Sequence, residues 1–540
     1  MNRSRPVLVL AGLNITIDGA RILEDVGITL HSGRIHVVLG ASGSGKSTLL
    51  RTLMGLHRPG VIVQSSAFRL SVRDGLEIVR DWDLGDADER VWAGIRGSRI
   101  GMVFQDSADT LTPLRRVGSL LAEASRGIPQ PCRTATGNRL HEAGIDEHAG
   151  VERNYCFELS GGMAQRVGFA LAVAGEPAVL LADEPSTALD GVARRALADA
   201  LRRRAEGGAS VLLVTHDRAL ASALADDVTV LHAGRCQQTG PAEEVLAALP
   251  QRGGGRTSDA GVHVADSANR AIVPSGGVTR SSAVRIRGLH HGYSAAGRDV
   301  LRGVDLDLGE GESLGLLGRS GSGKSTLIKC LVGLERPRAG TIEVAGLAAW
   351  NHPWKRLRRE IQLIPQDPRA ALNPWRTALQ QIMDPLDFHR IGTRRGRLDR
   401  ATELLDLVGL TRLGDRRPDQ LSTGQCQRVS IARAMAVAPS VLVADEPVTA
   451  LDGAARTVML GLLRTLCRSS GAAMLVVSHD IEALEELCPR IAVLHDGAIV
   501  EELVAGRLEQ AVSDPARSII DAYFSLASRR FPNDERKGTQ

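Results

Sequence analysis

The chain has 540 residues, which is too many for one hydrophobic core and predicts two to four compact units. Its 43% apolar and 24% charged residues are typical of a water-soluble globular protein, and a net charge of only +4 gives no reason to expect nucleic acid. No apolar run approaches the ~18–20 residues that span a bilayer, the first residues lack the apolar core of a signal peptide, and no C-x-x-C motif suggests a metal or disulfide site. These features predict a cytosolic chain.

A glycine-rich turn at residues 40–48, GASGSGKST, follows an apolar run and matches the phosphate-loop pattern G-x-x-x-x-G-K-[ST]. Backbone N–H groups of such a turn point at an anion, its lysine contacts the β- and γ-phosphates, and the next hydroxyl can hold Mg²⁺. A turn that binds nothing is the simpler alternative, but residues 318–326, GRSGSGKST, repeat the element. The nucleotide-contacting residues expected in the two copies are Gly40, Ser42, Gly43, Gly45, Lys46, Ser47 and Thr48, and Gly318, Ser320, Gly321, Gly323, Lys324, Ser325 and Thr326.

The spacing of such motifs indicates a tandem duplication. Lys324 follows Lys46 by 278 residues, whereas Asp445 follows Asp183 by 262, so the first half carries about 16 extra residues, which we place within residues 61–98. A Gly- and Ser-rich stretch without periodicity predicts a flexible linker between the halves. The resulting division is a first domain at residues 1–249, a linker at 250–283, a second domain at 284–513 and a C-terminal tail, to which we assign no function, at 514–540.

Each half also contains an apolar run that ends in Asp-Glu. Apolar strands that alternate with helices predict an α/β fold with a parallel sheet covered on both faces, and ligands bind at the carboxyl ends of such strands. The first carboxylate, Asp183 or Asp445, can hold Mg²⁺. The second, Glu184 or Glu446, can orient or deprotonate an attacking water. One strand ending in Asp-Glu is weak evidence, but two copies downstream of phosphate loops favour a functional role.

A third repeated motif is a Ser-Gly turn that opens a predicted helix. Ser160 precedes Asp183 by 23 residues, and Ser422 precedes Asp445 by the same number. Such a turn can bind an anion at the helix N-terminus, although an ordinary N-cap has the same residues. The glycines that follow the two serines are Gly161, Gly162 and Gly424.

Together these motifs resemble those of ATP-binding-cassette (ABC) proteins, whose L-S-G-G-Q signature is highly specific, over nearly all the chain outside the linker and tail. The resemblance implies two tandem nucleotide-binding domains, each a P-loop NTPase core with a parallel sheet, an antiparallel β subdomain and a helical subdomain. Gln105 and Gln366 resemble the family's glutamine that senses the γ-phosphate and Mg²⁺ and links to the membrane partner. His216 and His479 resemble its switch histidine.

In this family two cassettes stack head to tail, so that each ATP lies between the phosphate loop of one and the signature of the other. The resemblance therefore implies ATP and Mg²⁺ as cofactors and two composite sites within one chain. One site would combine Lys46, Ser47, Gln105, Asp183, Glu184 and His216 with Ser422 and Gly424, and the other Lys324, Ser325, Gln366, Asp445, Glu446 and His479 with Ser160, Gly161 and Gly162. The implied catalytic residues are Glu184, His216, Glu446 and His479, and the implied metal ligands are Ser47, Gln105, Asp183, Ser325, Gln366 and Asp445.

The two sites are not equivalent. Tyr293 falls where the family stacks an aromatic ring on adenine, a contact that contributes about 1 kcal/mol, whereas the first half has Ile17 there. The second signature has Thr423 in place of the usual glycine, and a β-branched residue is expected to restrict backbone approach or an unusual φ. Both differences fall on the site around Lys46, which we expect to turn over more slowly.

The sequence does not define the transported solute. Residues 371–375, ALNPW, resemble a Ser-Leu-Asn-Pro segment of the peptide and nickel import subfamily, and the lack of a C-terminal cysteine cluster favours its nickel-type members. The implied function is an ATP-hydrolysing subunit that energises import of a peptide, nickel ion or metal chelate. Its partners would be two membrane-spanning permease subunits and a separate extracytoplasmic solute-binding protein, without nucleic acid, and it would lie at the cytoplasmic face of the membrane as a peripheral protein.

Three other functional classes are alternatives to an importer. A ribosome-associated ATPase generally has a long charged helical linker, which residues 250–283 do not resemble. A DNA-repair ATPase needs a long coiled coil or a zinc motif, and the sequence has neither. An exporter ATPase remains an alternative, against which the first signature and the Asn-Pro segment argue.

Overall fold

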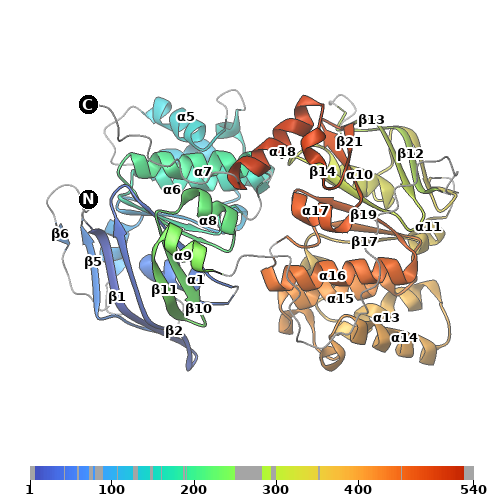
Figure 1. Ribbon diagram of the computed structural model, residues 1–540, viewed down its shortest axis with the longest axis horizontal. Helices are drawn as coiled ribbons and strands as arrows, with labels where there is room; N and C mark the ends of the chain where they lie inside the picture. Colours follow the sequence, from blue (N-terminus) through green and yellow to red (C-terminus); the bar gives the residue numbers. More distant parts are fainter. Residues whose placement is uncertain are drawn as a thin grey trace.

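The computed structural model describes residues 6–41, 43–57, 60–71, 77–78, 89–105, 107–125, 132–145, 150–159, 161–186, 189, 191–249, 282–293, 299–350, 353–449, 451 and 453–527. Two units of the same architecture lie side by side, the first coloured blue to green and the second yellow to red (Figure 1). Each unit has an antiparallel sheet, a mostly parallel sheet and surrounding helices, so the α/β fold of two tandem cassettes predicted from the sequence is confirmed.

The antiparallel sheet of each unit follows from strands whose apolar residues alternate with polar ones, so that one face packs on the core. Its strands are paired in the order β2-β1-β5-β6 in the first unit, with β4 also on β1, and β13-β12-β15-β16 in the second. They are β1 (Pro6–Ile17), β2 (Ala20–His31), β4 (Val61–Gln64), β5 (Ala67–Ser71) and β6 (Glu77–Ile78), and β12 (Ser282–His291), β13 (Leu301–Gly309), β15 (Ala339–Val344) and β16 (Leu347–Ala348).

The second sheet is parallel except for one edge strand in each unit. Its central strands are almost continuous apolar runs because helices cover both faces. The order is β11-β10-β3-β9-β8-β7 in the first unit and β17-β18-β19-β14-β20-β21 in the second, which is the same topology read from opposite edges. The strands are β3 (Ile35–Leu39), β7 (Ile100–Val103), β8 (Val179–Asp183), β9 (Ser210–Thr215), β10 (Asp227–His232) and β11 (Arg235–Pro241), and β14 (Ser313–Gly318), β17 (Ile361–Ile364), β18 (Val441–Asp445), β19 (Ala473–Ser478), β20 (Arg490–His495) and β21 (Ala498–Val504).

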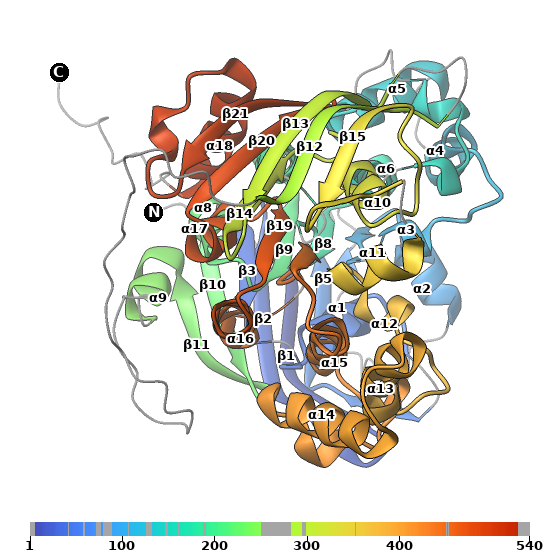
Figure 2. The same ribbon diagram turned by 90° about the vertical axis from the view of Figure 1, so that its right-hand side faces the viewer.

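Helices surround both sheets and form a helical subdomain between β7 and β8, and between β17 and β18 (Figures 1 and 2). Among the described residues, none of them combines the length and apolarity needed to cross a bilayer. The helices of the first unit are α1 (Lys46–Leu53), α2 (Glu89–Ile95), α3 (Ser107–Thr110), α4 (Val117–Ala124), α5 (Cys132–Glu142), α6 (Gly161–Ala174), α7 (Gly191–Glu206), α8 (Arg218–Leu224) and α9 (Ala242–Ala248). Those of the second are α10 (Lys324–Leu331), α11 (Trp354–Glu360), α12 (Pro368–Ala371), α13 (Ala378–His389), α14 (Arg394–Leu407), α15 (Thr423–Met435), α16 (Gly453–Ser470), α17 (Ile481–Leu487) and α18 (Asp514–Ala527).

A glycine–tryptophan contact marks where the two units differ in length. A Cβ on Gly55, which has φ 63°, would overlap the Trp92 ring, and a Cβ on Gly333, at φ 75°, would overlap Trp354. The glycines are 278 residues apart and the tryptophans 262, so the extra residues of the first unit lie between Gly55 and Trp92. This interval overlaps the predicted stretch 61–98.

The C-terminal segment differs from the sequence-based description. Residues 514–527, assigned there to the tail, form α18, which buries Ala516, Ile519 and Ile520 in the core of the second unit. The same helix reaches across to α7 and α8 of the first unit (Figure 1). Part of the predicted tail is therefore a structural element that contacts both units.

Candidate nucleotide-binding sites

The first phosphate loop is a close turn between β3 and α1. Gly45 is the N-cap of α1 with φ 98°, a conformation that favours glycine, and a Cβ there would clash with the Leu23 side chain. The Lys46 Nζ donates hydrogen bonds to the carbonyl oxygens of Gly40 and Ala41, at 2.7 and 2.8 Å. The loop therefore wraps around a positive charge at the start of a helix, where an anion is stabilised.

The second phosphate loop repeats this geometry between β14 and α10. Gly323 has φ 108°, and the Lys324 Nζ donates to the carbonyls of Gly318 and Arg319, at 2.6 and 2.9 Å. The buried hydroxyls of Ser44 and Ser322, at matching positions of the two loops, have no hydrogen-bond partner among the described residues. Unpaired donors together with a lysine and helix N–H groups suit the phosphates of a nucleotide.

A carboxylate lies beside the loop hydroxyl in the first unit. The Ser47 Oγ donates to Oδ1 of Asp183 at 3.1 Å, at the end of β8. Burial raises the pKa of Asp183, and burial followed by the neighbouring Glu446 raises the pKa of Asp445 to about 6. A buried carboxylate and a hydroxyl are the oxygen ligands that suit Mg²⁺, so the donor set fits a magnesium ion shared with phosphate oxygens.

The residue that follows each of these aspartates is a glutamate, and a histidine that the sequence singled out contacts it. In the second unit, His479 Nδ1 lies 2.8 Å from Oε1 of Glu446, while the hydroxyls of Thr449 and Ser478 donate to Oε2 at 2.8 and 3.0 Å. Burial opposes the charged carboxylate, but His479 and the two hydroxyls outweigh it and lower the pKa of Glu446. Burial likewise disfavours the charged imidazolium of His479, but the neighbouring Glu446 carboxylate outweighs burial and raises the pKa of His479.

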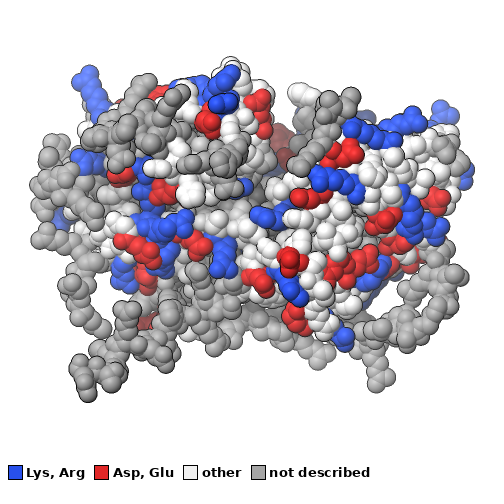
Figure 3. Space-filling view, turned by 90° about the horizontal axis from the view of Figure 1, so that it is seen from above, with Lys and Arg blue, Asp and Glu red and all other residues white. Residues whose placement is uncertain are grey.

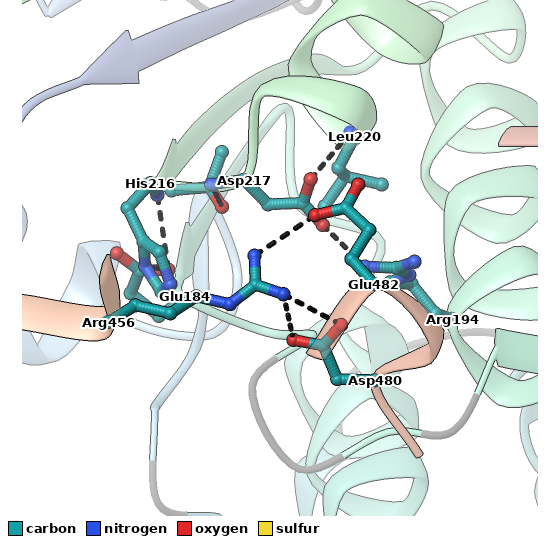
Figure 4. Close-up of polar contacts among 9 residues, drawn as sticks. Glu184, Arg194, His216, Asp217, Leu220, Arg456, Asp480 and Glu482 are labelled. Atoms are coloured by element: carbon teal, nitrogen blue, oxygen red, sulfur yellow. Dashed lines mark hydrogen bonds and ion pairs between the residues drawn. The ribbon is translucent and has the colours of Figure 1, made fainter. Parts of the chain in front are cut away.

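The first unit has the same pair. His216 Nδ1 lies 2.9 Å from Oε2 of Glu184, and this hydrogen bond raises the pKa of His216 (Figure 4). Glu184 and Glu446 have φ values of 45° and 48°, in the left-handed region that L-residues rarely adopt. Such backbone is typical of functional sites, where surrounding contacts hold a side chain in one direction.

The strand order explains why these residues meet. The strands β3, β9, β8 and β7 are neighbours, as are β14, β19, β18 and β17, so the segments that follow them share one edge of each sheet. Gln105 and Gln366 follow β7 and β17 at this edge and are exposed. The structure thus brings together the predicted lysine, aspartate, glutamate, histidine and glutamine of each unit.

The signature residues begin helices, as predicted. Gly161 and Gly162 are the first residues of α6, and Ser422 caps α15, where its hydroxyl accepts from Gln425 N at 3.3 Å. Thr423 is the first residue of α15, with its side chain exposed and its φ in the helical region, so the expectation that it meets an unusual φ is wrong. Ser42 and Ser160 lie outside the described residues.

Tyr293 lies beside the second phosphate loop. Its hydroxyl is 3.1 Å from Thr326 Oγ1 on α10, the Lys329 ammonium is 5.7 Å from its ring centroid, and the side chain is 58% exposed. Ile17, at the end of β1, instead packs on the core of the first unit. The site around Lys324 therefore has an aromatic side chain at this position, and the site around Lys46 has an aliphatic one.

Sequence reasoning missed a polar cluster where the units meet. Arg194 pairs with Asp217 at 2.8 Å in the first unit, and Arg456 pairs with Asp480 at 2.8 Å in the second, so an arginine holds the aspartate after each switch histidine (Figure 4). Tyr523 of α18, a helix of the second unit, contacts the arginine of the first unit, because the Arg194 guanidinium lies 5.6 Å from the Tyr523 ring centroid. The signal available in the sequence was the repeat itself, since both arginines occupy matching positions.

Comparison with known proteins shows which family the chain resembles. The family model described as "ABC transporter" matches residues 23–187 and 301–449. The glutathione import ATP-binding protein GsiA of Salmonella paratyphi A is 34% identical over 542 residues, covering 92% of this chain and 86% of that protein. The oligopeptide transport ATP-binding protein OppD of Mycobacterium tuberculosis is 32% identical over 606 residues, covering 94% and 96%. A solved post-hydrolysis ATP-binding cassette bound to ADP and Pi is 32% identical, with a TM-score of 0.39, and covers 41% of this chain and 98% of that one.

Two phosphate loops with paired Asp-Glu and histidine residues define a protein that binds and hydrolyses nucleoside triphosphate. The chain belongs to the ABC transporter family and is a tandem-cassette ABC ATPase that binds ATP.

Proposed function

We propose that this chain is the ATP-hydrolysing subunit that energises import of a peptide across the cytoplasmic membrane through separate permease subunits. The observation that carries the proposal is the complete set of lysine, aspartate, glutamate and histidine in both units, in a chain matched nearly end to end by import ATP-binding proteins. The named relatives import glutathione or transport oligopeptides, which favours a peptide. A nickel ion or metal chelate, which the sequence favoured, is retained as the second candidate solute.

The proposed machinery comprises two cassettes, at residues 1–249 and 284–513, that pair within the chain across the linker at 250–283, with residues 514–540 following. In the proposal each ATP lies between the phosphate loop of one unit and the signature of the other. Among the described residues, a Cβ on Gly43, Gly321 or Gly161 would meet no heavy atom within 4 Å, so these surfaces are accessible to a ligand.

The roles of the residues follow from the contacts described above. Lys46 and Lys324 would bind the β- and γ-phosphates. Asp183, Ser47 and Gln105 would hold Mg²⁺. When bound, this ion would stabilise the negative charge that develops on the phosphate oxygens. Glu184 and Glu446 would polarise the attacking water, while the histidines that contact them would fix the carboxylate orientation. Tyr293 would stack on adenine at the site around Lys324, and we propose that the site around Lys46 turns over more slowly.

The partners in this proposal are two membrane-spanning permease subunits and a separate solute-binding protein that delivers the cargo. ATP would close the two cassettes, hydrolysis would reopen them, and the docked membrane subunits would follow. The chain would lie at the cytoplasmic face of the membrane as a peripheral subunit.

The test is uptake in cells whose only copy of the chain carries Lys46→Ala and Lys324→Ala. Labelled glutathione, a labelled oligopeptide and labelled Ni²⁺ are supplied in parallel, and Lys537→Ala, outside both phosphate loops, is the matched control. Loss of peptide or glutathione uptake alone supports the proposal, and loss of Ni²⁺ uptake alone supports the second candidate. Unchanged uptake of all three, while the purified wild type still hydrolyses ATP, refutes both solute assignments.

A further inference from the structure

A buried histidine lies beside the exposed tyrosine at the nucleotide site of the second unit. Tyr293 follows the end of β12, and because its side chain is 58% exposed, general packing does not fix the direction of its ring. His291 is the last residue of β12, and its ring is perpendicular to the Tyr293 ring, with 5.2 Å between the centroids and 89° between the planes. This edge-to-face geometry is one that two aromatic rings prefer. His291 is 5% exposed, so the contact comes from the core of the unit.

Two hydrogen bonds hold His291 in place. The Nδ1 atom of its ring lies 3.1 Å from the carbonyl oxygen of Arg336, and because a carbonyl oxygen can only accept, Nδ1 carries the proton. The backbone carbonyl of His291 accepts from the N–H of Val300 at 2.7 Å. Both the ring and the backbone of His291 are therefore fixed without the help of Tyr293.

The buried imidazole carries a free-energy cost that an aliphatic side chain would avoid. The Nε2 atom of His291 is buried and has no hydrogen-bond partner among the described residues. A buried polar atom without a partner is destabilising. By contrast, Arg287 of the same strand pairs with Asp307 at 2.6 Å, and acidic and basic side chains are interspersed on the face seen in Figure 3. Stability alone therefore does not account for a histidine at this position.

The first unit has an aliphatic residue at the matching position. Ile15 precedes Ile17 by two residues on β1, as His291 precedes Tyr293 on and after β12. Ile15 is fully buried in the core of its unit. The unit that has an exposed aromatic ring thus also has a buried imidazole beside it, and the other unit has neither.

The other contacts of Tyr293 come from the nucleotide site itself. Its hydroxyl lies 3.1 Å from Thr326 Oγ1, and its ring centroid lies 5.7 Å from the Lys329 ammonium, both on α10. Thr326 is among the residues expected to contact the nucleotide, so its hydrogen bond to Tyr293 competes with the ligand. The contact with His291 comes from outside the phosphate loop and can persist when nucleotide is bound.

We propose that His291 is a positioning residue that holds the Tyr293 ring in the direction in which it stacks on adenine. A ring that is already oriented loses less rotational freedom when the nucleotide binds, so the affinity for the adenine nucleotide is higher. In this role His291 contacts neither the base nor the phosphates and acts through Tyr293. The inference rests on the proposed function, because it assumes that Tyr293 stacks on adenine at the site around Lys324.

Equilibrium binding to the full chain tests this role. Lys46→Ala first removes the phosphate-loop lysine of the other site, and a ribose-labelled fluorescent ATP is then displaced by ATP or by inorganic tripolyphosphate, which has no base. His291→Leu should weaken ATP binding about two- to fivefold, no more than loss of the stacked ring itself, and leave tripolyphosphate binding unchanged. His290→Leu is the matched control, because the neighbouring His290 ring lies toward Asp299 at 3.6 Å, and it should leave both affinities unchanged. Unchanged ATP binding in His291→Leu, or an equal loss for ATP and tripolyphosphate, overturns the inference.

A double-variant cycle shows whether His291 acts through Tyr293. In a chain that carries Tyr293→Leu, a further His291→Leu should not weaken ATP binding any more, because no ring is left to hold. His291→Asn keeps a hydrogen-bond donor near Arg336 but has no ring, so it should weaken ATP binding as His291→Leu does. Additive losses in the double variant, or wild-type affinity in His291→Asn, overturn the inference.

Failure of the inference can be told apart from failure of the proposal on which it rests. If Tyr293→Leu leaves ATP binding unchanged, the proposed stacking on adenine and the inference fail together. If Tyr293→Leu weakens ATP binding and His291→Leu does not, only the inference fails.

Discussion

His479 Nδ1 lies 2.8 Å from Oε1 of Glu446, and His216 makes the same contact with Glu184 at 2.9 Å. Both glutamates have left-handed backbone, which costs on the order of 1–3 kcal/mol and persists only where neighbouring contacts hold it. The imidazole and the strand end together therefore fix the direction of each carboxylate.

Replacing the glutamates separates binding from hydrolysis. Glu184→Gln and Glu446→Gln keep the size of the side chain but remove its basicity, so we expect ATP binding to persist and hydrolysis at the altered site to fall by about 10²–10⁴-fold. Because the site around Lys46 is expected to be slower, Glu446→Gln should cost more of the total ATPase rate than Glu184→Gln. Equal losses would contradict the asymmetry, and no loss would contradict the role of the glutamates.

The Glu446–His479 pair should make stability depend on pH. The pKa of Glu446 is lowered, so its contribution is complete above the ordinary value of 4.5 and is lost as pH falls through the folded-state pKa. The pKa of His479 is raised, so its contribution is complete below 6.5 and is lost as pH rises through the folded-state pKa. The Tm difference between wild type and His479→Gln should therefore be largest between pH 4.5 and 6.5, while His232→Gln, at an exposed position, should show little difference. A constant difference from pH 4.5 to 9 would argue against the ion pair.

The glycine–tryptophan contact can be tested with two glycines of similar φ. Gly333→Ala would push a methyl group into the Trp354 ring, whereas Gly346, at φ 73°, has no neighbour within 4 Å of an added Cβ. We expect Gly346→Ala to lower the free energy of unfolding by about 1–2 kcal/mol, and Gly333→Ala by a further ~1–3 kcal/mol. Denaturant unfolding of both variants measures this difference. Equal losses of unfolding free energy in the two variants would show that the Trp354 ring can shift without an energetic penalty.

Tyr523 should couple the two units energetically. A double-mutant cycle of Arg194→Ala and Tyr523→Ala should give a coupling free energy of about 0.5–2 kcal/mol, because the guanidinium faces the ring. Tyr523→Phe keeps the ring and should retain the coupling. Denaturant unfolding of the four proteins gives the coupling free energy. A coupling free energy of zero would show that this contact does not stabilise the interface.

Tyr293 should contribute to nucleotide affinity at one site only. Tyr293→Leu removes an aromatic surface worth about 1 kcal/mol, which corresponds to about fivefold weaker ATP binding at the site around Lys324. Ile17→Leu is the matched substitution in the first unit and should leave affinity nearly unchanged. Equilibrium binding of a fluorescent ATP analogue distinguishes the two. Equal effects would show that adenine does not stack on Tyr293.

The sequence predicted the features that depend on local patterns. Both phosphate loops and the residues that end β8, β9, β18 and β19 could be located because each follows an apolar run, and the duplication supplied an internal check. Of the two effects expected of Thr423, an unusual φ does not occur because the residue starts a helix, where a β-branched side chain faces solvent without strain, whereas restricted backbone approach stays a prediction.

Long-range contacts could not be predicted in the same way. The Arg194–Asp217 pair joins residues on different elements, and no local pattern specifies it. Helix α18 was overlooked because its apolar residues, Ala516, Ile519 and Ile520, are followed by a polar C-terminal stretch that dominated the interpretation.

The contact of α18 with the first unit has a consequence for assembly. Two cassettes joined by the chain and also touching through α18 meet at an effective concentration set by their tether, on the order of millimolar, rather than by their abundance in the cell. Because both units belong to one chain, they are synthesised in equal amounts. The high effective concentration favours pairing of a first unit with a second unit over pairing of two identical units from different chains. Every chain therefore carries one copy of each of the two unlike phosphate loops, in a fixed one-to-one stoichiometry.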